Sequence, residues 1–302
     1  QKVKLALQTV DDWLLQLADE VLPPLYQAHK AAALNRDVLF TDDTPIALIV
    51  KGLGKTKQAR LWAYRTGAGP PLVVYDFSVD RRKQRPLDFL GDYRGFIHAD
   101  AYSGYDELFG KPGVIEIGCW THARRKFDEA RSSAPREATE MIATIGRLYQ
   151  VEAAAADLND QERAALRQVR CPPILDGLFT RAVALQAVTL PKSPLGQALT
   201  YLLNQRAALQ RYLTDGRLRP DNNLAENILR ALAIGRKNWL FFGGERGGRA
   251  AAIFYSLLQS CLLNQVNPLT YLEDVLNRIM SHPAERLVEL LPHRWHPQPQ
   301  SR

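Results

Sequence analysis

Three acidic residues of the chain occupy positions that suit metal-dependent chemistry. Asp42 lies beside Asp43 inside an otherwise apolar run, VLFTDDTPIALIV, at residues 38–50. A carboxylate in a buried strand is costly unless it is paired or ligates a metal. Asp100 ends another β-rich run, and Glu226 borders the apolar stripe of a helix that follows Pro220. Carboxylates that converge from separate elements are the ligands on which two Mg²⁺ ions carry out phosphodiester chemistry. For each acid alone, a strand-end turn, a salt bridge or a solvated first-turn glutamate is an alternative explanation.

The elements that would position these acids are strands interrupted by one helix. Short β-rich runs occur at residues 38–50, 60–66, 71–77, 95–100 and 113–120, and a helical stretch falls at 86–93. Three consecutive strands followed by helix and strand predict a mixed sheet of the ribonuclease-H-like fold, in the α/β (α+β) class. In that strand order the first and fourth strands are neighbours. Asp42 and Asp100 would then meet at the centre of the sheet.

The remaining sequence is predominantly helical. An amphipathic helix is predicted from Thr9, with Thr9 and Asp12 as a capping box and with Pro23-Pro24 at its end. Ser193 and Asn267 are predicted helix caps, and further helices are expected at 222–234, 249–264 and 268–280. The predicted domains are an N-terminal helical segment (1–36), a catalytic domain (37–126 and 217–280), an all-helical insertion (127–216) and a C-terminal tail (281–302). The end of the tail, HPQPQSR, is expected to be disordered.

The charge of the chain favours a polyanionic partner. Its 302 residues carry 39 Lys and Arg against 32 Asp and Glu, a net charge of +7. GLGKTK is not a phosphate-binding loop, because that motif requires glycine where Ile49 stands. Basic side chains interleaved with aromatic rings can hold phosphates and stack on unpaired bases; for Trp239 the alternative is a place in the core. The candidate DNA-binding residues are Lys55, Lys57, Arg60, Arg124, Arg125, Lys126, Arg236, Lys237, Trp239, Arg246 and Arg249.

Cysteine usage and hydropathy favour a cytoplasmic protein without a membrane span, and binding to DNA would make it nucleoid-associated. The three cysteines form neither a C-x-x-C pair nor an even set, and no apolar run reaches the roughly 18 residues of a span. Cys119 and His122 have C-x-x-H spacing. Without a second such pair a zinc site is disfavoured, and a packed cysteine beside a capped histidine is an alternative.

Several long motifs resemble the transposases of the insertion-sequence-66 (IS66) family. They include VLFTDDTP, GLGKTKQARLWAY, HADAYSGY, GCWTHARRKF and DNNLAENILRALAIGRKNWLFFGGERGGRAAAIFYSLLQSCLLNQVNPLTYLEDVLNRI, and the match covers nearly all of residues 10–295. The resemblance implies a ribonuclease-H-like catalytic domain whose Asp-Asp-Glu (DDE) triad is Asp42, Asp100 and Glu226. Asp43 stands where the family usually has Glu. Asp43, Cys119 and His122 are therefore auxiliary candidates, with His122 expected close to the scissile phosphate.

The resemblance implies an enzyme that cleaves DNA at element ends with water and joins the freed 3′-hydroxyl to target DNA. Two Mg²⁺ ions, for which Mn²⁺ would substitute, would be held by the triad. DNA is the expected partner, together with accessory proteins of the same element and further copies of the chain assembled on DNA. The match is to the catalytic portion of the family, so recognition of terminal repeats is expected to lie mostly outside this chain. The alternatives are a ribonuclease-H-like nuclease or resolvase, which cuts without joining, and an inactive DNA-binding remnant.

Overall fold

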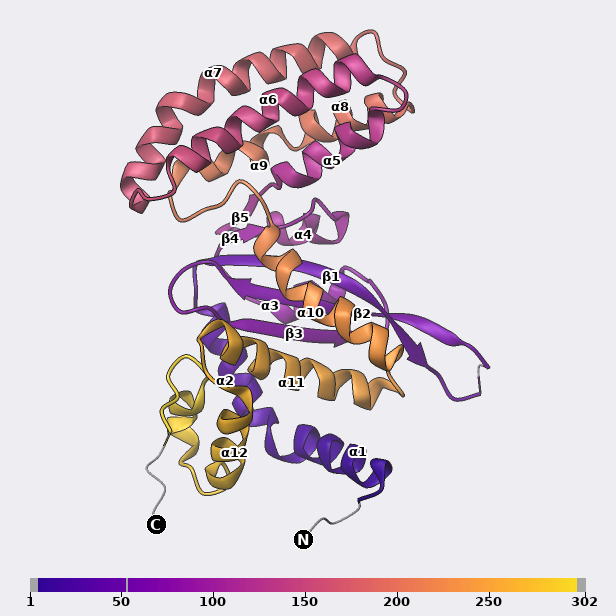
Figure 1. Ribbon diagram of the computed structural model, residues 1–302, viewed down its shortest axis with the longest axis vertical. Helices are drawn as coiled ribbons and strands as arrows, with labels where there is room; N and C mark the ends of the chain where they lie inside the picture. The colour runs from indigo at the N-terminus through magenta and orange to yellow at the C-terminus, as the bar shows by residue number, and fades with distance from the viewer. Residues whose placement is uncertain (1–4, 53, 298–302) are drawn as a thin grey trace. The chain divides into compact units, whose positions relative to one another are not determined.

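The computed structural model describes residues 5–52 and 54–297 and has a mixed α/β architecture (Figure 1). Its five strands form one mixed sheet in the order β3-β2-β1-β4-β5, so the expected neighbourhood of the first and fourth strands is confirmed. All five strands overlap the β-rich runs of the sequence, although β2 begins before its predicted run of 60–66 and β5 ends before residue 120. They are β1 (Val38–Ile49), β2 (Thr56–Thr66), β3 (Val73–Ser78), β4 (Gly95–His98) and β5 (Val114–Ile117).

Twelve α-helices are assigned among the described residues. They are α1 (Leu7–Gln16), α2 (Pro23–Leu34), α3 (Gln84–Leu90), α4 (Asp106–Phe109), α5 (Trp120–Ala130), α6 (Pro135–Ala154), α7 (Asp160–Gln186), α8 (Pro194–Asn204), α9 (Arg206–Gln210), α10 (Asn223–Trp239), α11 (Glu245–Leu263) and α12 (Pro268–Arg278). A π-helical turn (Leu17–Val21) joins α1 to α2, and 3₁₀ turns occur at Ser103–Tyr105, Arg211–Thr214 and Ala284–Leu290. None of the helices in the described ranges combines the length and apolarity of a membrane span.

The helix caps only partly match the sequence prediction. The Ser193 side chain accepts from the Gly196 amide at the start of α8, and Asn267 caps α12 in the same way, as predicted. The capping box at Thr9 is wrong, because α1 begins at Leu7 and Thr9 therefore lies within its first turn. Most of the predicted disordered end, residues 298–302, lies outside the described residues.

The chain divides into two compact units. Unit 1 comprises the described residues up to 95, residues 104–108 and the residues from 224 onward; unit 2 comprises residues 96–103 and 109–223. Unit 1 is thus assembled from the two ends of the chain. The predicted insertion, 127–216, lies within unit 2 together with β5, α5 and most of β4.

In unit 1, one face of the antiparallel strands β1, β2 and β3 is covered by α10 and α11. Ile46, Leu61 and Tyr75 of the strands share a buried cluster with Ile228 of α10 and Ala252 of α11. Burial of such apolar side chains is the main favourable contribution to folding. The cluster fixes α10 on the face of β1 that carries residues of even number.

The opposite face of the same strands is lined by aromatic rings. The rings of Tyr64 and Phe89 stack with centroids 4.1 Å apart, and Trp62 meets the edge of Tyr105 at 6.2 Å. The Tyr105 hydroxyl is 2.9 Å from the hydroxyl of Thr41 on β1. Aromatic pairs in these geometries stabilise a core beyond the area they bury.

The outer edge of β3 is closed by side chains instead of by another strand. The amides of Val73 and Tyr75 donate to the hydroxyls of Ser260 (2.9 Å) and Ser256 (2.8 Å), both on α11. The Val73 carbonyl oxygen lies 2.9 Å from Nε2 of His29, which is buried on α2. An edge strand with unpaired backbone groups is a template for aggregation. These side chains remove that template.

In unit 2, the helices α5, α6, α7 and α8 pack on one another, and each of them buries apolar side chains. Arg167 of α7 is 1% exposed. Its guanidinium donates to both carboxylate oxygens of Glu152 at 2.9 and 2.6 Å, and also to the carbonyls of Tyr212 and Asp215. A buried charge is tolerated when it is paired and fully hydrogen-bonded. Arg167 thus ties α7 to α6 and to the segment that leads toward α10.

Candidate active site

Asp42 and Asp43 point to opposite faces of β1, because successive side chains alternate along a strand. Asp42 pairs in register with Ala63, which belongs to the buried cluster beneath α10 and α11. Asp43 pairs with Trp62 on the aromatic face. Of the two neighbouring acids, only Asp42 therefore shares a face with α10, the helix that carries Glu226.

Hydrogen bonds fix the position of α10 along the length of β1. The Tyr75 hydroxyl donates to the carbonyl of Ile228 at 2.8 Å. Tyr75 is opposite Ala63, and Ala63 is opposite Asp42, so Ile228 lies over the rung of Asp42. Glu226 lies two residues before Ile228, about 3 Å along the helix axis and roughly 200° around it. Unit 1 thus places the Glu226 backbone close to the level of Asp42, on the same face of β1.

The end of α10 confirms that the helix runs alongside β1 in the same direction. Arg236 donates to the carbonyl of Pro45 at 2.6 Å, and Phe242, just after the helix, forms a parallel bridge with Leu48. At the start of α10, the Leu224 carbonyl accepts a bond of 3.5 Å from Arg65, which pairs with Phe40. Glu226 lies between these two anchors, in the first turn of α10, and is half-buried.

Asp43 is held by two arginines on the aromatic face. Its side chain is 2% exposed, and it accepts from Arg60 at 3.0 Å and from Arg81 at 2.7 and 2.9 Å. Charge-assisted, bidentate bonds of this kind are the strong ones. The two arginines therefore hold the Asp43 carboxylate within the fold. Arg81 was not found from the sequence, because nothing in its local pattern distinguishes it from a solvated cation.

Asp100 lies in unit 2, two residues after β4, in a tight loop. Its Oδ1 accepts from the amide of Tyr102 at 3.1 Å, and Ala101 between them has φ of 61°. A non-glycine residue in the left-handed region is uncommon and marks a backbone that its surroundings hold in place. The position of this carboxylate relative to the strand end is therefore defined within its own unit.

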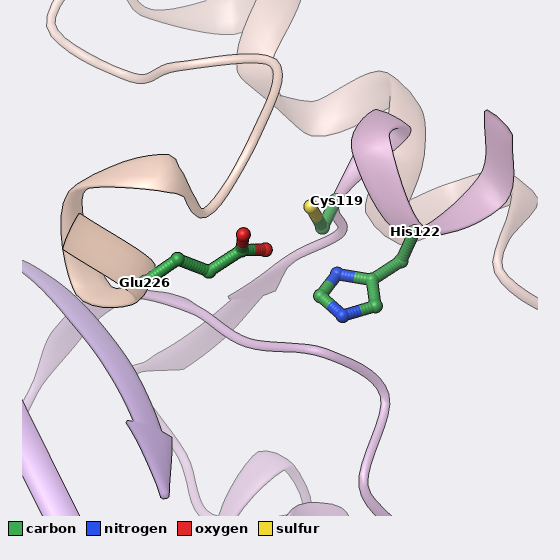
Figure 2. Close-up of side chains that lie close together, drawn as sticks. All are labelled: Cys119, His122 and Glu226. Atoms are coloured by element: carbon green, nitrogen blue, oxygen red, sulfur yellow. The ribbon is translucent and has the colours of Figure 1, made fainter. Parts of the chain in front are cut away.

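Cys119 and His122 are placed by the start of α5 in unit 2. Cys119 is the residue before the helix and is buried, and His122 lies in the first turn (Figure 2). Ligand atoms of these two residues are within 4.8 Å of each other. The Cys119 sulfur also accepts from the amide of Asn222 at 3.3 Å, which ties α5 to the chain entering α10. Cys119 thus has a packing role whether or not His122 acts on a substrate. Glu226, also drawn in Figure 2, belongs to unit 1.

The candidate DNA-binding cations of unit 1 are of two kinds. Lys55 and Lys57 are exposed at the start of β2 and in the turn before it, and Lys237 is exposed at the end of α10. The other four contact protein groups: Arg60 pairs with Asp43, Arg236 donates to a backbone carbonyl, Arg246 pairs with Asp19 at 2.5 Å, and Arg249 is 3.7 Å from Glu245. DNA contact stays a prediction for all of them, and the three lysines have the most freedom to make it.

The aromatic residues after Lys237 do not share one environment. Trp239 stacks on Phe242, with centroids 4.9 Å apart and planes at 18°, and packs against the buried cluster of unit 1. Trp239 therefore packs as the alternative to DNA contact predicted, with its ring against the core. Phe241 is instead 43% exposed. Sequence reasoning did not separate these rings, because WLFF contains no polar residue to mark the exposed position.

In unit 2, Arg124 and Arg125 are exposed on α5, and Lys126 is half-buried. The Lys126 ammonium lies 5.7 Å from the centre of the Tyr201 ring, within the range of a cation–π contact. The three cations therefore remain candidates for phosphate contact, with Lys126 the most constrained.

Comparison with known proteins gives matches along almost the whole chain. The family described as Transposase IS66 family matches residues 1–250, and the IS66 C-terminal element matches residues 256–293. Two relatives from Sinorhizobium fredii (strain NBRC 101917 / NGR234) are similar. The uncharacterized protein y4hP is 31% identical over 98% of this chain and 58% of its own length. The uncharacterized protein y4qI is 34% identical over 94% of this chain and 54% of its own length. The chain thus spans little more than half the length of these relatives.

Proposed function

The chain belongs to the IS66 transposase family, and from this premise we propose that it is the catalytic portion of a DDE transposase with a ribonuclease-H-like core. The supporting observation is that the first turn of α10, which carries Glu226, lies close to the level of Asp42 on the same face of β1. Asp100, in unit 2, is the proposed third carboxylate. DNA is the partner that a transposase acts on. The reaction proposed is cleavage of DNA strands at element ends followed by strand transfer.

The donor set fits Mg²⁺. Asp42 and Glu226 offer half-buried carboxylate oxygens, the hard ligands that this cation prefers. Bound Mg²⁺ would activate the attacking oxygen and stabilise the leaving one. The residues of the chain would hold the ions, position the phosphodiester and exclude competing water. The apolar cluster beneath α10 keeps both carboxylates on rigid elements, which is what a catalytic constellation requires.

The triad is tested by removing one charge at a time. We expect Asp42→Asn, Asp100→Asn and Glu226→Gln each to abolish Mg²⁺-dependent strand cleavage and the joining of a pre-cut end to target DNA. DNA affinity and the unfolding midpoint in EDTA should stay close to those of the parent chain. Asp12→Asn, at an exposed position on α1, is the matched control. Full activity in any of the three variants would contradict the assignment. Cutting without joining by the parent chain would instead indicate a nuclease.

A second readout does not depend on turnover. Binding of Mg²⁺ to the native state alone should raise the melting temperature of the parent chain. The rise should be much smaller in Asp42→Asn and Glu226→Gln and unchanged in Asp12→Asn. An equal rise in all four proteins would show that Mg²⁺ binds elsewhere.

A further inference from the structure

The loop between α10 and α11 presents two apolar side chains to solvent. Leu240 is 64% exposed and Phe241 is 43% exposed. Leu240 has φ of 54°, and the Phe241 amide donates to the Trp239 carbonyl at 2.5 Å. A non-glycine residue in the left-handed region costs free energy and persists only where the surrounding structure imposes it. The backbone conformation of Leu240 is thus held by the residues around it.

The flanking residues supply that constraint. The Phe242 amide donates to the carbonyl of Ala47 at 2.8 Å, and the Ile49 amide donates to the carbonyl of Phe242 at 2.9 Å. The Phe242 ring is buried between Trp239 and Phe77. Phe241 follows the tight turn at Leu240, is 43% exposed and does not belong to the buried cluster that Phe242 enters. The exposed ring is therefore carried on a loop anchored at both ends.

The surroundings of Phe241 are cationic. Leu48, which bridges to Phe242, pairs in register with the exposed Lys57, and Lys51 and Lys55 follow in the turn between β1 and β2. The sequence contains no Asp or Glu from residue 44 to 75 or from 227 to 244. An apolar protrusion within such a surface is complementary to a polyanion that also offers flat apolar faces. Single-stranded nucleic acid has both properties, because its bases stack on aromatic rings while its phosphates contact cations.

Resting on the proposed function, we propose that Phe241, with Leu240 beside it, stacks against an unpaired base at a DNA end held by the lysines of the β1–β2 hairpin. Trp239 and Phe242 support this contact from the core without touching DNA. A base that is already unpaired is favoured because no pairing has to be broken before it stacks. The chain should therefore prefer ends with single-stranded extensions over blunt ends.

The test compares two duplexes of equal length with the full chain, one blunt and one with a short 3′ extension that carries 2-aminopurine. Fluorescence anisotropy measures affinity, and quenching of 2-aminopurine reports stacking. We expect Phe241→Ala to lose roughly tenfold in affinity for the extended duplex, together with the quenching, and to bind the blunt duplex as before. Phe241→Trp should restore both, whereas Phe241→Leu, which keeps an apolar side chain without a ring, should not. Val188→Ala, at an exposed apolar position of unit 2, is the control.

The outcomes separate stacking from DNA binding as such. Unchanged preference for the extended duplex in Phe241→Ala, or an equal loss on both duplexes, would overturn the stacking contact while leaving the proposed transposase function intact. Failure of the parent chain to bind either duplex would overturn both. A change of oligomeric state in Phe241→Ala, seen by light scattering, with unchanged DNA preference would show that a second copy of the chain covers this loop.

Discussion

The outer edge of β3 and the β1–β2 hairpin belong to the same three antiparallel strands of unit 1. The polar groups of the β3 edge are bonded to protein side chains, whereas the lysines of the hairpin are exposed to solvent. At β3, backbone amides and a carbonyl are bonded to Ser256, Ser260 and His29. At the hairpin, β1 and β2 extend beyond β3 (Figure 1), and Lys51, Lys55 and Lys57 are exposed. Among the described residues, no acidic side chain forms an ion pair with these lysines.

We therefore expect the β3 edge to determine the stability of the fold and the hairpin to determine the affinity for DNA. A buried hydrogen bond is expensive to break, so the β3 edge should govern unfolding. An exposed cation contributes little to stability but attracts phosphate over several ångströms. Variants at the two regions should therefore affect different measurements.

The largest expected effect is a loss of stability at acidic pH. Burial lowers the pKa of His29 to about 4 and that of His98 to about 3. Both are neutral in the folded chain and take up protons near pH 6.5 once it unfolds. The unfolded state therefore binds more protons, and stability should fall as the pH drops from about 6.5 to about 4. For His29 alone the loss amounts to roughly 3 kcal/mol.

Urea unfolding at several pH values measures this loss. Acidic groups also titrate in part of this range, so the difference between the parent chain and His29→Gln isolates the histidine. The glutamine amide can still donate to Val73 but does not titrate, and its variant should show a flatter pH dependence. Parallel curves for the two proteins would show that His29 is not the cause.

A smaller effect is expected from removing one hydroxyl at the β3 edge. Ser260→Ala leaves the Val73 amide without the hydroxyl that accepts its hydrogen bond and should lower the free energy of unfolding by about 1 to 3 kcal/mol. Affinity for blunt duplex DNA should not change. Ser132→Ala, at an exposed position of unit 2, should change stability by less than about 0.5 kcal/mol. A parallel fall in DNA affinity in Ser260→Ala would break the separation between the two regions.

The smallest effect on stability should come from the hairpin. Replacing Lys51, Lys55 and Lys57 together by Gln should change the free energy of unfolding by less than about 0.5 kcal/mol. The slope of the logarithm of DNA affinity against the logarithm of salt concentration should become shallower by about 2 to 3, because each phosphate contact contributes close to one. An unchanged slope would show that these lysines do not contact DNA.

Local patterns predicted the strands and most helices because burial, side-chain alternation and helix capping depend on residues that are close in sequence. The boundaries of β1 and the caps at Ser193 and Asn267 are of this kind. The same alternation explains why Asp42 and Asp43 face opposite sides of β1 in the structure. It did not say which side receives α10, because that depends on contacts such as Tyr75 with Ile228, which are distant in sequence.

The roles within WLFF show the same limit. Trp239, Phe241 and Phe242 are equally apolar, and the parallel bridge between Phe242 and Leu48 decides which ring is buried.

The protein groups that bind the cations could not be predicted from the sequence either. Arg60 and Arg236 are candidate DNA-binding residues in the sequence, yet each bonds to a residue that only the folded sheet brings near. Charge composition predicted a polyanionic partner but not which cations are available to it.

The closure of β3 also affects how the protein folds during synthesis. The hydroxyl that satisfies the Val73 amide lies 187 residues further along the chain. At a translation rate of 5 to 20 residues per second, this partner emerges roughly 10 to 40 seconds after the strand. During that interval the nascent strand edge is open, while unit 2, encoded in between, can complete its own core. A ribosome-bound chain therefore has a period in which pairing with another nascent chain or binding by a chaperone competes with the native closure.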